Sequence, residues 1–118
     1  MEGGALTPKK LATLVVEAAQ DTKALDLVVL DLSKLTSFTD YFVICSGRSD
    51  TQVRSIADNK QKKLNANSRY PLGMEGYKKG WWVLLDFGDV VAHIFYHETR
   101  DYYNLEKLWS DAVITRHS

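Results

Sequence analysis

The stretch of sequence that decides the fold is residues 81–96, which read WWVLLDFGDVVAHIFY. Both halves are rich in the branched and aromatic residues that favour strands, and Gly88 and Asp89 between them suit a tight two-residue turn. The pattern predicts a β-hairpin with strands over 81–87 and 90–96.

The turn also predicts which side chains of the hairpin share a face, because opposed residues in an antiparallel pair lie on the same side of the sheet. With residue 87 opposite residue 90, one face is almost purely apolar and is expected to be core: Trp81, Val83, Leu85, Phe87, Val90, Ala92, Ile94 and Tyr96. The other face mixes large apolar groups with polar ones: Trp82, Leu84, Asp86, Val91, His93 and Phe95. This mixed face is either covered by a helix or open as a binding surface, and a slip of one residue in register would exchange the two faces.

The periodicity of apolar residues predicts the elements on either side of the hairpin. A helix is expected to begin at Thr7 and Pro8, a hydroxyl cap followed by a first-turn proline, and to run to about residue 20. Further along we expect strands over 25–32 and 41–45, a helix capped by Asp50, a loop or irregular edge strand over 68–79, and a closing helix over 103–113. The predicted fold class is α/β, with a single domain over residues 1–118 and a mixed sheet of four to five strands flanked by helices.

The composition is that of an ordinary folded chain with no overall electrostatic field. Hydrophobic residues make up 45% of the 118 residues, which is far from a disordered composition. Fifteen Lys and Arg balance fifteen Asp and Glu, so any binding to nucleic acid or to an anionic membrane must come from a local patch.

The single cysteine and the hydropathy pattern favour a protein of the cytoplasm. Cys45 can form no internal disulfide and is expected to be a buried structural residue. No apolar stretch approaches the roughly 20 residues needed to span a bilayer, and residues 1–4 do not resemble a signal peptide.

The sequence offers few groups for catalysis or metal binding. Metal-ligand types occur at Asp86, Asp89, His93, His97 and Glu98, but their spacing matches no specific metal signature. The turn at residues 46–49, Ser-Gly-Arg-Ser, follows a strand and opens a helix, which favours an ordinary helix cap over a phosphate-binding turn.

The helix after residue 50 has one apolar and one basic face. Its predicted buried stripe is Val53, Ile56, Ala57, Lys60 and Leu64. The basic face favours a solvated surface, and the alternative is an RNA-binding module that uses Arg54, Lys60, Lys62, Lys63 and Arg69.

Several segments resemble the Iojap, or ribosomal silencing factor, family. They are TDYFVICSG at 39–47, QVRSIAD at 52–58, Glu75-Gly76, WVLLDFGDVVAHIF at 82–95, and Arg100 with YYNLEKLW at 102–109. They occur in the expected order and at the expected spacing between about residue 11 and residue 112. Each segment alone is a weak match, and together they are specific.

The resemblance implies a fold related to the nucleotidyltransferase core and a function without catalysis, metal or cofactor. It implies binding to the large ribosomal subunit through its fourteenth ribosomal protein, at the face where the small subunit joins. Subunit joining would be blocked and translation repressed when nutrients are limiting. A homodimer is left open.

The resemblance also places the docking surface on the hairpin, where Trp82 matches the key tryptophan of the family. Leu84, His93, Phe95, Glu75 and Gly76 are added by proximity, whereas the neighbouring Trp81 is assigned to the core. The rival function is a nucleotidyltransferase-like enzyme. Such an enzyme needs a Gly-Ser turn and paired acidic residues, but here the order is Ser46-Gly47 and the next helix start has no matched acidic pair.

Overall fold

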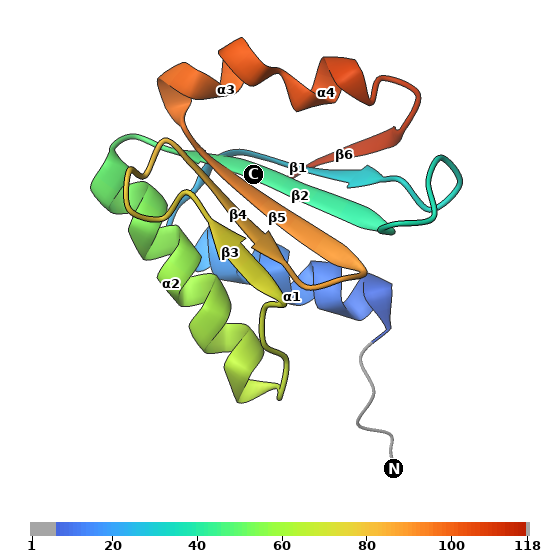
Figure 1. The fold of residues 1–118 in the computed structure, drawn as a ribbon, viewed down its shortest axis with the longest axis horizontal. Helices are drawn as coiled ribbons and strands as arrows, with labels where there is room; N and C mark the ends of the chain where they lie inside the picture. Colours follow the sequence, from blue (N-terminus) through green and yellow to red (C-terminus); the bar gives the residue numbers. More distant parts are fainter. Residues whose placement is uncertain (1–6, 118) are drawn as a thin grey trace.

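A computed structural model describes residues 7–117 as a twisted sheet with helices on both of its faces (Figure 1). Residues 1–4, where we expected no signal peptide, lie outside the described residues. In the described part of the chain, no helix is long and apolar enough to cross a membrane.

The sheet has six strands in the order β3-β4-β5-β2-β1-β6. Strands β2 and β5 pair in parallel, and the other neighbours pair antiparallel. Along the chain the elements are α1 (Pro8–Asp21), β1 (Leu25–Asp31), β2 (Tyr41–Gly47), α2 (Asp50–Ala66), β3 (Gly73–Glu75), β4 (Trp82–Asp86), β5 (Val90–Tyr96), α3 (His97–Tyr103), α4 (Leu105–Leu108) and β6 (Val113–His117).

Both long helices begin with a hydroxyl cap. Thr7 caps α1 as predicted, because its side chain accepts a hydrogen bond from the backbone N–H of Lys10 at 3.2 Å. The cap of α2 is Ser49 and not Asp50, since the Ser49 hydroxyl accepts from the N–H of Gln52 at 3.0 Å. Asp50 is instead the first residue of the helix.

Two apolar clusters lie on opposite faces of the sheet. Helices α1 and α2 cover one face, and the connected pair α3 and α4 lies over the other (Figure 1). Cys45 is fully buried in the first cluster, which confirms its predicted burial, and burial raises the pKa of its thiol.

Lys60 is also fully buried where α1 packs against α2. Its Nζ donates to the backbone carbonyl of Val15 at 3.0 Å, and burial lowers the pKa of its amine. The predicted stripe of α2 is therefore confirmed, lysine included.

The predicted closing helix over 103–113 is wrong, because Asn104 interrupts it and the chain ends in a strand. Asn104 adopts a left-handed conformation with φ of 43°, ends α3, and caps α4 by accepting from the N–H of Lys107. The segment after α4 then pairs antiparallel with β1 as β6. The sheet has six strands and not four to five because of this edge strand; the irregular edge strand within 68–79 is β3.

Candidate functional site

The hairpin forms with the register that the sequence predicts. Leu85 lies opposite Ala92, and Trp82 lies opposite Phe95. The turn between the strands is held by the Asp86 carboxylate, which accepts from the N–H of Gly88 at 2.8 Å while Gly88 adopts a φ of 86°. The division into an apolar face and a mixed face is therefore confirmed.

Trp82 lies on the mixed face and contacts several aromatic rings. Its indole lies 5.1 Å from the ring centroid of Phe95 and 4.5 Å from that of Tyr103 on α3. The indole N–H donates to Nδ1 of His93 at 3.1 Å. The ring remains half-buried, so part of it is held by these neighbours and part of it is exposed to solvent.

His93 lies beneath Trp82 and is only 3% exposed. Burial lowers the pKa of His93 to about 3, so the imidazole is neutral at physiological pH. Because Nδ1 accepts the indole hydrogen, the ring proton is assigned to Nε2, a buried atom without a hydrogen-bond partner among the described residues. His93 therefore holds Trp82 from below, and only a small part of its side chain reaches the depression described below.

The other predicted docking residues differ in how far their side chains are exposed to solvent. Phe95 is fully buried, whereas Leu84 is half-buried and Glu75 on β3, directly opposite it, is exposed. Gly76 adopts a φ of 80°, and a Cβ at this position would collide with the carbonyl oxygen of Trp82. Gly76 thus lets the loop approach β4 and offers no side chain to a partner.

Residues outside the hairpin complete the accessible surface, and sequence reasoning did not assign them to it. Tyr103 is 47% exposed beside Trp82, and Leu72 is 78% exposed ahead of β3. A depression of about 430 Å³ includes Leu72, Glu75, Leu84 and the exposed ring of Phe38. We call the accessible side chains of Leu72, Glu75, Trp82, Leu84 and Tyr103 the docking face. The mixed face is therefore covered in part by α3 and α4 and open in part.

Trp81 does not belong to the core, contrary to the prediction. Its side chain is 56% exposed, and the residue lies just before β4, at the end of the strand. Its backbone is held in place, with the carbonyl accepting from the N–H of Tyr96 at 2.9 Å and from the Thr99 hydroxyl at 2.7 Å. The alternation of residues did not reveal that this side chain lies at the surface.

The alternatives that the sequence raised are a metal site, a phosphate-binding turn and a basic RNA-binding face, and the structure shows the residues around each of them. Within residues 7–117 no group of three His, Cys, Asp or Glu side chains could hold a metal ion. The turn at 46–49 is used for capping, since Gln52 also accepts from the N–H of Arg48 at 2.6 Å. The basic face of α2 is broken up: Lys60 is buried, Lys63 pairs with Asp21 at 3.1 Å, and Arg54 pairs with Asp50 at 2.6 Å.

Comparison with known proteins gives a consistent match along the chain. A family model described as "Ribosomal silencing factor during starvation" matches residues 5–118. The ribosomal silencing factor RsfS of Bacillus subtilis is 41% identical over 109 residues, which cover 92% of each chain.

Two further relatives extend this comparison. A crystal structure of a Chromobacterium violaceum protein superposes with a TM-score of 0.87 at 39% identity, covering 89% of this chain and 88% of that one. A mouse protein named "Mitochondrial assembly of ribosomal large subunit protein 1" is 33% identical over 100 residues, which cover 82% of this chain and 44% of the mouse protein.

Proposed function

The chain belongs to the ribosomal silencing factor family, and from this premise we propose that it binds the large ribosomal subunit through the subunit's fourteenth ribosomal protein. Bound at the intersubunit face, it keeps the small subunit from joining and so represses translation when nutrients are limiting. It acts in the cytoplasm by occupying space, and it needs no catalysis or cofactor.

The observation that carries this proposal is the half-buried indole of Trp82 on the docking face. His93 and Phe95 beneath the ring and Tyr103 beside it restrict its motion, so little side-chain entropy is lost when a partner covers its exposed part. Rigid aromatic groups of this kind provide much of the binding energy at protein interfaces. The preorganised tryptophan therefore favours a protein partner with an apolar pocket.

Charge at the edge of the docking face indicates the character of that partner. Glu75 is exposed and Asp86 is half-buried beside Leu84. An acidic edge around an apolar centre favours a partner that brings Lys or Arg to the rim of the interface. The name of the mouse relative refers to the ribosomal large subunit, which supports the proposal that the partner of this chain belongs to that particle.

The proposal is tested by sedimentation with purified ribosomal particles. We expect the protein to co-sediment with large subunits and to be absent from small subunits and assembled ribosomes, because its site is covered once the subunits join. Equal recovery on all three particles would contradict the proposal.

A further inference from the structure

The exposed indole of Trp81 serves neither the core nor the docking face. It lies at the end of the sheet, where it lines a hollow together with Arg48, Ser49, Asp50 and Tyr96. The Lys79 ammonium is 5.2 Å from the centroid of its ring, a cation–π contact. A large aromatic ring that is exposed to solvent while its backbone is held by hydrogen bonds can stack on a planar group of a ligand.

The side chains around Trp81 are basic and available. Arg48, Lys78 and Lys79 are exposed, and within residues 7–117 none of the three forms an ion pair. The nearest carboxylate in the hollow, Asp50, is already paired with Arg54 at 2.6 Å. The hollow is therefore locally cationic, although the chain as a whole carries no net charge.

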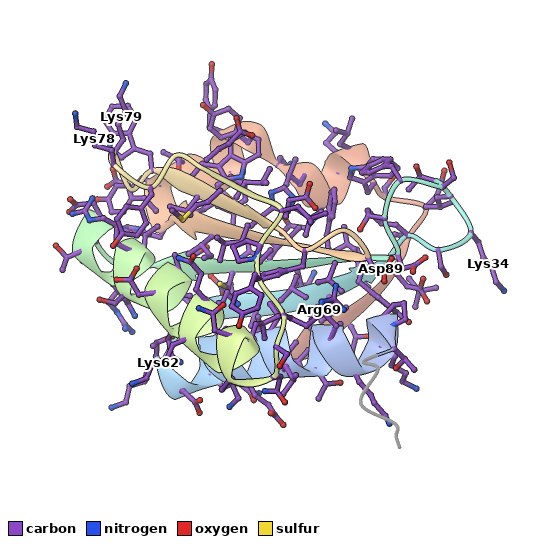
Figure 2. The ribbon with its side chains drawn as sticks, turned by 60° about the horizontal axis from the view of Figure 1, so that its bottom comes forward. Lys34, Lys62, Arg69, Lys78, Lys79 and Asp89 are labelled. Atoms are coloured by element: carbon purple, nitrogen blue, oxygen red, sulfur yellow. The ribbon has the colours of Figure 1, made fainter. Side chains whose placement is uncertain are left out.

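The loop that carries the two lysines is anchored independently of their side chains. Arg54 donates to the backbone carbonyl of Lys78 at 3.2 Å, and the Tyr77 hydroxyl donates to Asp58 at 3.0 Å. Figure 2 shows Lys78 and Lys79 projecting from the end of the molecule where α2 begins, whereas Lys34 lies at the opposite end and Lys62 points away from the outer side of α2. Lys78 and Lys79 can therefore be replaced without loosening the loop.

From this juxtaposition we infer that Trp81, Arg48, Lys78 and Lys79 form an RNA-binding patch, with the indole stacking on an unpaired base and the cations contacting phosphates. The inference rests on the proposed function, and the RNA is that of the large ribosomal subunit. Trp81 directly precedes Trp82 in the chain, so the patch borders the docking face and one bound molecule presents both surfaces.

An RNA partner fits the patch better than a second protein surface. Every base offers a π-face to an exposed aromatic ring, and Lys and Arg follow the phosphate backbone without sequence preference. The start of α2 is not the binding element, because Ser49 and Gln52 already satisfy backbone N–H groups there. The side chains thus supply the contacts.

The test compares two doubly substituted proteins that lose the same charge. Affinity is measured for purified large subunits over a series of salt concentrations, and separately for the isolated fourteenth ribosomal protein. K78A/K79A should weaken binding to the large subunit about tenfold and reduce the slope of log affinity against log salt concentration by about 2. Its affinity for the isolated ribosomal protein should not change. The control K34A/K62A, which removes two exposed lysines outside the patch, should leave both affinities unchanged.

The stacking contact is tested separately at the tryptophan. Trp81→Ala should weaken subunit binding about five- to a hundredfold, and Trp81→Phe should recover much of this loss because it keeps an aromatic face. If K78A/K79A weakens binding to the isolated protein as much as to the subunit, or changes neither affinity nor salt slope, the RNA patch is wrong. A parent chain that binds neither subunit nor isolated protein overturns the proposed function itself, and the patch with it.

Discussion

The indole N–H of Trp82 donates a 3.1 Å hydrogen bond to Nδ1 of His93, a histidine that is almost fully buried. This bond joins diagonal positions of neighbouring hairpin strands, since the residue opposite Trp82 is Phe95, and His93 on β5 lies opposite Leu84, two residues beyond Trp82 on β4. It fixes the orientation of the ring on which the proposed docking depends. His93 is thus a positioning residue beneath the docking face.

Replacing His93 with Phe should reduce binding more than stability. The substitution keeps an aromatic ring but removes the acceptor for the indole, while it also removes the unpartnered Nε2 atom. We expect a loss of about 1 kcal/mol or less in unfolding free energy and a three- to tenfold weaker affinity for the large subunit. Urea unfolding and a binding titration measure the two effects, and parental affinity in the variant would show that the hydrogen bond does not position Trp82.

The stability of the protein should fall as pH falls because of His93. Burial lowers its pKa to about 3, below the usual value of 6.5, so the unfolded chain takes up a proton at a higher pH than the folded chain does. Its contribution is fully present above about pH 6.5 and is lost progressively towards pH 3. We expect the unfolding free energy of the parent to fall relative to that of His93→Phe by up to several kcal/mol over this window. Parallel pH profiles of the two proteins would contradict this prediction.

Lys60 should be replaceable by an apolar side chain of similar length. Its ammonium is fully buried with one hydrogen bond to Val15, and burial lowers its pKa, so the charged form costs free energy in the fold. Lys60→Met should therefore leave stability at pH 7 unchanged or raise it by about 1–2 kcal/mol. The control Lys60→Ala opens a cavity and should destabilise by about 2–4 kcal/mol in the same urea titration. A methionine variant as unstable as the alanine variant would mean that the lysine head group stabilises the fold.

Sequence patterns predicted the hairpin well because the residues that determine it lie close together in the sequence. The alternation of residues and the turn at Gly88 and Asp89 are enough to set the register between Trp82 and Phe95. The N-terminal cap of α1 and the buried stripe of α2, including Lys60, follow from equally local patterns. The expected relation to the nucleotidyltransferase core stays a prediction.

The errors arise where tertiary structure decides the outcome. Apolar residues at helical spacing after Tyr103 predicted one helix, but Asn104 ends α3 and the β-branched segment from Val113 finds a partner in β1, far away in the sequence. Alternation likewise assigned Trp81 to the core without revealing that its side chain is exposed at the end of the strand. Tyr103 reaches Trp82 because α3 lies across the sheet, and no local pattern marks that contact.

The two adjacent tryptophans are expected to have different roles, and affinity for the isolated fourteenth ribosomal protein is the measurement that distinguishes them. Trp82→Ala should weaken this affinity about 30- to 1,000-fold, or roughly 2–4 kcal/mol, and lower stability by about 1–3 kcal/mol because the half-buried ring packs on Phe95 and Tyr103. Trp81→Ala is the matched control: the exposed ring should be lost with little change in stability and with parental affinity for the isolated protein. A folded Trp82→Ala protein that binds the isolated ribosomal protein as tightly as the parent would show that Trp82 does not anchor the docking face.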